Sequence, residues 1–153
     1  MRKIIISLSI CILILGCSIR RVNAKVISYD TNNNGIDDQW AYLEPDGSFK
    51  NVEQDNNYNG KRDAWIEYAD GERCIEKQDT NNDGKVDQWR YYKEGVVERC
   101  EQDIDYDNKV DIFSYYDNDI LVKKEYDQNA DGKIEKTELY DEKEKILKST
   151  QLR

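Results

Sequence analysis

Five short segments of this sequence begin with Asp and carry oxygen-bearing side chains at every second position. They start at Asp30, Asp55, Asp79, Asp103 and Asp127, which are 25, 24, 24 and 24 residues apart. Each has Asp or Asn at loop positions 1, 3 and 5, Gly or Asn at position 6, and Asp or Glu at position 9. Such side chains converge when the chain curls tightly, and about six to eight oxygens around one point is the coordination that Ca²⁺ prefers. The spacing therefore predicts repeated calcium loops.

The expected ligands are the side chains at positions 1, 3, 5 and 9 and the backbone carbonyl at position 7. In the first three loops these are Asp30, Asn32, Asn34, Ile36 and Asp38; Asp55, Asn57, Asn59, Lys61 and Asp63; and Asp79, Asn81, Asp83, Lys85 and Asp87. In the last two they are Asp103, Asp105, Asp107, Lys109 and Asp111, then Asp127, Asn129, Asp131, Lys133 and Glu135. Because the first two loops have few carboxylates, we expect weak binding, near ~10⁻⁴–10⁻³ M.

The pattern D-x-[DN]-x-[DN]-G resembles the calcium loop of EF-hands and of related calcium-loop repeats. An EF-hand also carries a bidentate Glu at position 12, on its exit helix. The first four segments have Ala41, Ile66, Arg90 and Ser114 there. The fifth has Glu138 and matches the whole EF-hand spacing, so that a helix over 139–147 is an alternative to the strand pair that repeat analogy favours. The resemblance thus implies calcium-type loops that join strands.

A plainer interpretation of the loops is that Asp and Asn only form Asx turns, which both residues do readily. For a single segment the two interpretations are balanced. Five evenly spaced copies favour ion binding in at least three of the loops.

The segments between the loops share a pattern of their own. An aromatic run follows each of the first four loops, then a turn, then a second β-prone run, which together are typical of a β-hairpin. Alternation places the members of each pair Trp40 and Tyr42, Trp65 and Glu67, Trp89 and Tyr91, and Phe113 and Tyr115 on one face. With 26–29 as a first strand, the sequence predicts an all-β fold over 26–153, an elongated array of about five antiparallel hairpins with about eleven strands.

The N-terminus has the features of an export signal. Arg2 and Lys3 precede an uncharged apolar run, residues 4–15, that is too short to span a bilayer as a helix. Gly16-Cys17 then resembles the lipobox of bacterial lipoproteins, which implies that residues 1–16 are removed and that Cys17 is lipidated. Residues 17–25 would form the lipidated Cys and a tether. Ser18 after the Cys favours the outer membrane if the cell has two.

Composition excludes several classes of function. The 153 residues include 23 Lys and Arg, 32 Asp and Glu and no His, for a net charge of −9. An acidic chain suits cations and is a poor partner for nucleic acid, and without His neither a Ser-His-Asp nor a Cys-His catalytic arrangement is possible. No nucleophile with an adjacent base is present, so we expect no enzymatic activity.

Cys74 and Cys100 lie in the second strands of adjacent hairpins, and export permits a disulfide between them. In a flat meander these strands are two apart, about 9.6 Å, which exceeds the ~7 Å limit for bonded Cα atoms. A bond would therefore require a curled or stacked array, and reduced thiols are the equal alternative.

Together these features predict a non-enzymatic lipoprotein of the bacterial cell envelope with calcium-binding repeats. It would act as a binding or structural spacer module, anchored in a membrane by its lipid, with an envelope protein or a glycan as its partner. The alternative function is a glycan- or cell-wall-binding module that uses the aromatic face, since its Trp-Arg-Tyr-Tyr run loosely resembles bacterial choline-binding hairpin repeats.

Overall fold

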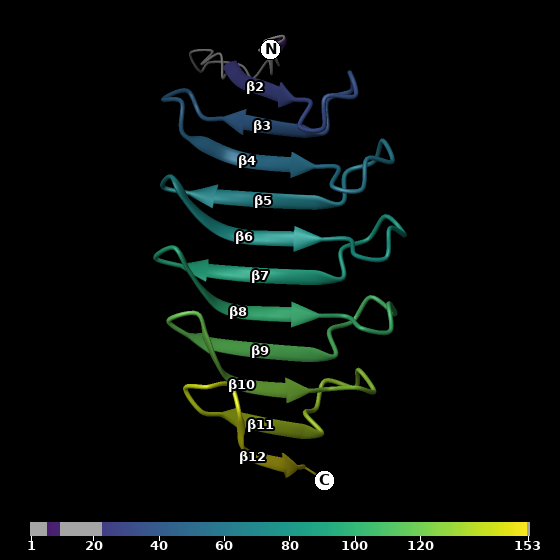
Figure 1. The fold of residues 1–153 in the computed structure, drawn as a ribbon, viewed down its shortest axis with the longest axis vertical. Helices are drawn as coiled ribbons and strands as arrows, with labels where there is room; N and C mark the ends of the chain where they lie inside the picture. The colour runs from purple at the N-terminus through teal and green to yellow at the C-terminus, as the bar shows by residue number, and fades with distance from the viewer. Residues whose placement is uncertain (1–5, 10–22, 153) are drawn as a thin grey trace, which may run out of the picture. The chain divides into compact units, whose positions relative to one another are not determined.

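The computed structural model describes residues 6–9 and 23–152 and divides the chain into two compact units, Met1–Gly71 and Glu72–Arg153. The strands of the N-terminal unit are β1 (Ile6–Ser9), β2 (Asn23–Tyr29), β3 (Gln39–Leu43), β4 (Phe49–Gln54) and β5 (Ala64–Ala69) (Figure 1). Those of the C-terminal unit are β6 (Glu72–Gln78), β7 (Gln88–Lys93), β8 (Val96–Gln102), β9 (Ile112–Asp117), β10 (Ile120–Tyr126), β11 (Lys136–Tyr140) and β12 (Ile146–Gln151). Cys17 lies outside the described residues.

Both units are antiparallel meanders in which each strand pairs with its neighbours in chain order. The described residues contain no helix, and the exit of the fifth loop forms β11 and β12 rather than a helix. The predicted all-β array of antiparallel hairpins is therefore confirmed. None of the described residues belongs to a helix long and apolar enough to cross a membrane.

The N-terminal strands differ from the expectation in two respects. Strand β2 begins at Asn23 rather than at residue 26, because it pairs with β3 from Lys25 onward and with β1 from Asn23 onward. Strand β1 lies within the predicted signal segment and pairs antiparallel with β2. The rest of the predicted signal and most of the tether lie outside the described residues.

Within each unit the Asp/Asn loops connect strands at one end and short turns connect them at the other. The turns β7–β8 and β9–β10 have two residues each, with φ of 52° at Glu94, 82° at Gly95, 50° at Asn118 and 64° at Asp119. Positive φ at both central residues defines the turn type that suits the twist of a hairpin. Asp119 takes the place that Gly95 has in the preceding hairpin, and Asn118 that of Glu94.

The strand register confirms the predicted aromatic face. In the N-terminal unit Trp40 is opposite Glu53, which is opposite Trp65; in the C-terminal unit Trp89, Glu101 and Phe113 are opposed in the same way. We call the face that carries these residues and their alternation partners the aromatic face, and the other the opposite face. The described residues contribute no second layer to cover either one.

Polar side chains, mostly loop carboxylates, outnumber apolar ones among the buried residues of the described part of the chain. Seven apolar residues are buried against ten polar ones, and eight of the ten are Asp at loop positions 1 or 9. In the N-terminal unit Ala41, Val52 and Ile66 form the apolar cluster, with Tyr68 packed against them. Organisation of these small units therefore depends heavily on the polar loops.

The aromatic face is held by repeated polar contacts. The hydroxyls of Tyr42, Tyr91 and Tyr115 donate to Glu53, Glu101 and Glu125 at 3.1, 3.0 and 2.9 Å. A cation lies over an aromatic ring beside each pair, namely Arg62 over Trp40, Arg99 over Tyr91 and Lys123 over Tyr115, at 4.0, 4.3 and 4.0 Å from the ring centroid. Burial and the neighbouring carboxylate raise the pKa of all three tyrosines. No second layer of the described residues packs on this face, and these cations and hydrogen bonds cover part of its aromatic surface instead.

Neither Cys74 nor Cys100 forms a disulfide. Cys74 is on β6 and Cys100 on β8, with β7 between them in the C-terminal unit. Of the two possibilities that the sequence left open, the structure has the flat meander with reduced thiols.

Candidate metal centre

All five Asp/Asn loops share one pattern of hydrogen bonds. In the third loop the Asp79 carboxylate accepts the N–H groups of Asp83 at 3.2 Å and Gly84 at 2.8 Å. Asn81 accepts the N–H of Asp83 at 2.9 Å, and Asp83 accepts that of Lys85 at 2.9 Å. The same contacts recur in the other loops. The side chains at positions 1, 3 and 5 are thereby turned into the loop, as the spacing predicted.

Two backbone positions permit this curl. Position 6 has a left-handed conformation in every loop, with φ of 92° at Gly84 and 73° at Asn108, which replaces Gly in the fourth loop as predicted. Position 4 is also left-handed, with φ of 60° at Tyr58, 65° at Tyr106 and 53° at Ala130. Position 4 was not identified from the sequence, because its residue type varies and only Asn33 and Asn82 hint at positive φ.

Two loops bring three carboxylates together. Oxygen atoms of Asp103, Asp105 and Asp107 in the fourth loop lie within 4.8 Å of one another, and so do those of Asp127, Asp131 and Glu135 in the fifth. In each group the position-1 Asp is buried, whereas most of the others are exposed. These two clusters could hold a metal ion, with an open side toward solvent.

The first three loops have the same geometry with fewer charges. Positions 1, 3 and 5 hold a single carboxylate in the first and second loops, at Asp30 and Asp55, and two in the third, at Asp79 and Asp83. Their Asn32, Asn57 and Asn81 side chains take the hydrogen-bonding place of Asp105. Metal affinity should accordingly fall from the last two loops to the third and then to the first two.

The Asp side chains at position 9 were predicted as metal ligands, but they hydrogen-bond to the backbone of the loop. Asp38, Asp63, Asp87 and Asp111 are buried and accept the N–H of the residue at position 2, and outside the fourth loop also that of position 3. None of the four belongs to the two carboxylate groups of the described residues. Glu135 is the exception, since it accepts the N–H of Gln128 at 2.8 Å and also reaches the cluster of the fifth loop. The Glu135 side chain is one methylene longer than the Asp side chains at the same position, and this accounts for its reach.

Position 9 also links one loop to the next within each unit. The Asp55 N–H donates to the Asp38 carbonyl at 2.9 Å, the Asp103 N–H to Asp87 at 2.9 Å and the Asp127 N–H to Asp111 at 2.8 Å. Each position-9 residue thus fixes the backbone of the following position-1 ligand. Binding in one loop should therefore favour the folded form of its neighbour.

The residues at position 7, whose carbonyls were predicted ligands, lie on the exposed rim of each loop. They are Ile36, Lys61, Lys85, Lys109 and Lys133, and each N–H donates to the position-5 side chain. Lys109 and Lys133 also lie near the outer oxygens of Asp107 and Asp131, at 3.9 and 3.6 Å. A bound cation would compete with these ammonium groups.

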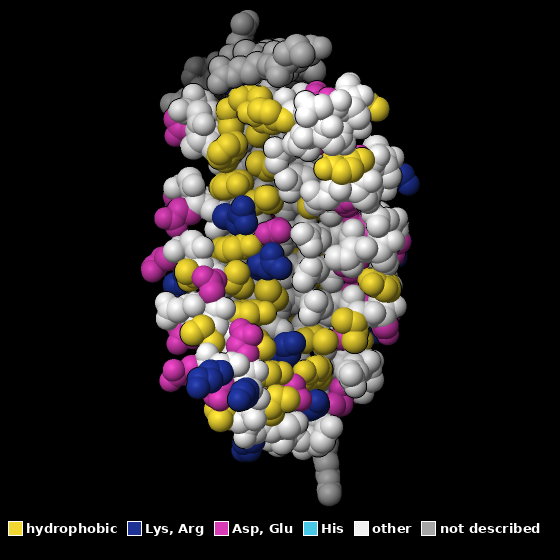
Figure 2. All heavy atoms as spheres, viewed as in Figure 1, with side chains coloured by type: hydrophobic (Ala, Val, Ile, Leu, Met, Phe, Trp, Pro, Cys, Tyr) yellow, Lys and Arg dark blue, Asp and Glu magenta, His cyan; other side chains and the backbone are white. Residues whose placement is uncertain are grey.

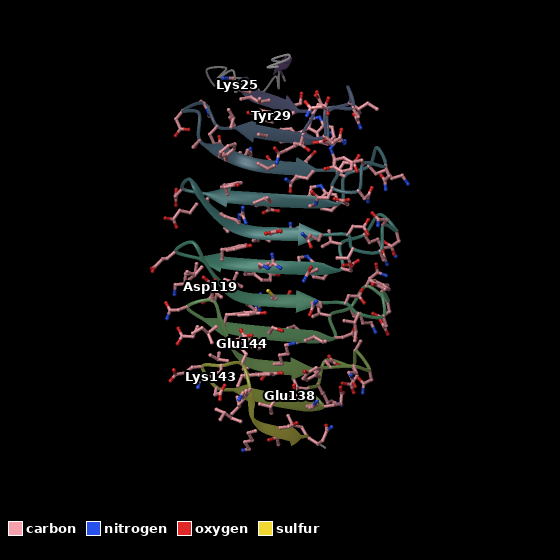
Figure 3. The ribbon with its side chains drawn as sticks, viewed as in Figure 1. Lys25, Tyr29, Asp119, Glu138, Lys143 and Glu144 are labelled. Atoms are coloured by element: carbon pink, nitrogen blue, oxygen red, sulfur yellow. The ribbon has the colours of Figure 1, made fainter. Side chains whose placement is uncertain are left out.

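The Glu138 side chain at position 12 contacts residues outside the carboxylate cluster of the fifth loop. It lies buried on β11 and pairs with Lys136 at 2.6 Å, and the hydroxyls of Tyr126 and Tyr140 both donate to it at 2.7 Å (Figure 3). The Lys136 ammonium, followed by the two hydroxyls, lowers the pKa of the Glu138 carboxyl from 4.5 to about 2. The structure therefore places Glu138 in a cross-strand network rather than among the loop oxygens.

This network gives Glu138 a measurable pH signature. A carboxyl whose folded-state pKa is lowered stabilises the protein above its unfolded pKa, and this contribution is lost as pH falls. Glu138→Gln should cost roughly 2 kcal/mol at pH 7, and its difference from the wild type should shrink between about pH 4.5 and about 2. Urea unfolding across this range measures it. The exposed turn residue Glu142 provides the matched control, Glu142→Gln; an equal pH dependence in both variants would refute the role of the network.

Comparison with protein-family models, with curated proteins and with solved structures finds no match.

Proposed function

We propose that this chain is a non-enzymatic lipoprotein of the bacterial envelope whose Asp/Asn loops bind Ca²⁺. In this proposal the ions stabilise a hairpin scaffold that acts as a binding or spacer module. One observation carries it, the two groups of three carboxylates whose oxygens lie within 4.8 Å of one another. Two oxygens bound to one ion at about 2.4 Å can be at most about 4.8 Å apart, so this spacing suits Ca²⁺.

The chemistry of the loops supports calcium over other metals. Every candidate ligand is an oxygen, and transition metals generally prefer sites with imidazole or thiolate. Mg²⁺ requires near-ideal octahedral geometry at about 2.0–2.1 Å and retains its waters. The rims formed by residues such as Asp105 and Asp107 are exposed to solvent. These features favour the larger ion, whose coordination is more adaptable.

A calorimetric titration tests the proposal. We expect the full chain to bind at least two Ca²⁺ ions with dissociation constants near ~10⁻⁴–10⁻³ M. Asp105→Asn should weaken binding in the fourth loop about tenfold, because charge count sets the affinity of such loops. Asn is compatible with the fold at this position, since the other four loops have it there. Asp117→Asn, on the exposed end of β9, is the matched control and should bind as the wild type does. If calcium addition to the wild type produced no heat of binding, the loops would be Asx turns that bind no ion.

The contacts on the aromatic face support the scaffold role over the glycan-binding alternative. The hydroxyls of Tyr42, Tyr91 and Tyr115 are already used by cross-strand Glu residues, and cations cover several of the rings. A glycan would have to displace these partners. A glycan array or a peptidoglycan pull-down distinguishes the two functions, and we expect no saturable binding in either.

Anchoring through Cys17 is a separate prediction. Because Cys17 follows Gly16 at the end of the apolar run, we expect it to be acylated when the chain is expressed in a bacterium. Metabolic palmitate labelling should mark the wild type and spare Cys17→Ser, while Cys74→Ser should be labelled normally. Equal labelling of the wild type and Cys17→Ser would rule out the lipid anchor.

A further inference from the structure

A second polar site lies on the opposite face of the C-terminal unit, away from the loops. Four residues, one from each of β7, β8, β9 and β10, are in cross-strand register: Arg90 is opposite Cys100, Cys100 is opposite Ser114, and Ser114 is opposite Lys124. At about 4.8 Å between strands, the Cα atoms of Arg90 and Lys124 are roughly 14 Å apart. Two small side chains therefore lie between two long cationic ones.

The same row is apolar and filled in the N-terminal unit. There Ala41 is opposite Val52, and Val52 is opposite Ile66, all of them buried in the apolar cluster. In the C-terminal unit the small side chains leave a cavity of about 290 Å³, with Cys100 and Ser114, 6% and 2% exposed, among its lining residues. This volume is near the lower limit of ligand pockets, roughly 300 Å³. Figure 2 shows this face, where Lys and Arg side chains lie among the apolar ones over the strands.

The residues around the cavity are mainly hydrogen-bond donors. Arg90, Lys124, Tyr116 and the amides of Gln88 and Gln102 line it. Asp119, at the β9–β10 turn, lines it as well (Figure 3). The Asp119 carboxylate already accepts the Val97 N–H at 2.8 Å. Within the described part of the chain, Lys124 has no carboxylate within ion-pair distance, and its half-buried side chain lines the cavity. A cation in this position suits an acidic group from outside the chain.

Two acids of the same cross-strand row lie beyond the two cations, whereas Asp119 lines the cavity itself. Glu76, which precedes Arg90 in the same row, is 3.5 Å from the Arg90 guanidinium. Glu138, which follows Lys124, is occupied by Lys136 and two tyrosine hydroxyls. Arg90 is therefore already ion-paired at the outer end of the row, and Lys124 is the cavity-lining cation without a carboxylate partner among the described residues.

We propose that this cavity binds a small organic dicarboxylate, with one carboxylate on Arg90 and the other on Lys124. Because both cationic residues line the cavity, a short diacid of about four carbons can place one carboxylate on each. The Ser114 hydroxyl donates to the bound anion, and the amides of Gln88 and Gln102 complete its shell. This site is independent of the calcium loops.

Calorimetry at fixed free calcium tests the charge requirement with succinate and butyrate as probes. The two have the same number of carbons and differ by one carboxylate. We expect saturable binding of succinate to the full chain, at least tenfold tighter than butyrate, because a second charge-assisted contact contributes about this factor. Equal affinities, or no binding of succinate, would overturn the proposal.

Two variants localise the site. Lys124→Gln should weaken succinate about tenfold and leave butyrate nearly unchanged, and Ser114→Ala should weaken both. Lys148→Gln removes the same charge from the exposed strand β12, where Lys148 is opposite Leu139 on the other face, and should bind as the wild type does. The same loss of affinity in Lys124→Gln and Lys148→Gln would indicate general charge screening and overturn the assignment.

Cys100 provides a reporter that does not depend on folding differences between variants. Iodoacetamide alkylates a thiol: the S–C bond forms, iodide leaves and the thiol proton goes to solvent. Saturating succinate should slow alkylation of Cys100 at least fivefold, while Cys74, which is not among the cavity-lining residues, should react at its usual rate. Peptide mass mapping measures both thiols in one sample. Unchanged alkylation of Cys100 under saturating succinate would place the anion elsewhere and overturn the site.

Discussion

Millimolar calcium should raise the melting temperature of the full chain by roughly 10 °C. A ligand that binds only the folded state stabilises by about 1.4 kcal/mol per site at tenfold saturation, so the two carboxylate clusters together contribute about 3 kcal/mol. For a chain of this length each kcal/mol shifts the transition by roughly 2–4 °C or more. The reason is local: without an ion the fourth loop holds Asp103, Asp105 and Asp107 at close range, and a cation converts their repulsion into attraction.

Thermal unfolding followed by circular dichroism, in chelator and at about 5–10 mM calcium, measures this effect at roughly five- to tenfold above the weaker end of the expected range of dissociation constants. Magnesium at the same concentration should do less, and NaCl at matched ionic strength should do little. Combining Asp105→Asn with Asp131→Asn removes one carboxylate from each cluster and should abolish most of the shift. An unchanged melting curve in calcium would show that the protein is a plain hairpin scaffold.

Asp111→Ala should destabilise the protein by roughly 2–3 kcal/mol whether or not calcium is present. Its side chain is 1% exposed and accepts the Ile104 N–H at 2.7 Å. Truncation removes a buried carboxylate and leaves the partly buried Ile104 N–H without its acceptor, at the point where the Asp111 carbonyl also accepts the Asp127 N–H. Both the fourth loop and the start of the fifth should therefore loosen. Urea unfolding in chelator and in calcium measures the loss.

The comparison with Asp105→Asn separates structural from ligand carboxylates within one loop. Asp105 is exposed, so Asp105→Asn should leave stability in chelator nearly unchanged and reduce only the stabilisation by calcium. Asp111→Ala should show the reverse pattern. If Asp111→Ala lost calcium binding while keeping its stability in chelator, position 9 would be a ligand after all.

The five loops and the strands between them could be predicted from the sequence because their determinants are local. Each loop is an arrangement of side chain to backbone hydrogen bonds between residues at most seven positions apart, such as those from Asp83 and Gly84 to Asp79 and from Thr80 to Asp87. Position 6 requires a positive φ, and the residue types there, Gly84 and Asn108, indicate this in the sequence. Alternation along each strand placed Trp89 and Tyr91 on one face without knowledge of the partner strands.

Only the tertiary structure decided which carboxylates are ligands and which hold the backbone. Asp111 and Glu135 have the same loop position, yet only Glu135 reaches the cluster, because burial and one methylene separate their roles. Glu138 matched the spacing of an EF-hand, but the register of β10, β11 and β12 surrounds it with Lys136, Tyr126 and Tyr140. The row from Arg90 to Lys124 joins residues 34 positions apart in the sequence. Such contacts depend on strand register, which no local pattern specifies, so the sequence determined the loops and their period while the sheet determined what each charged side chain faces.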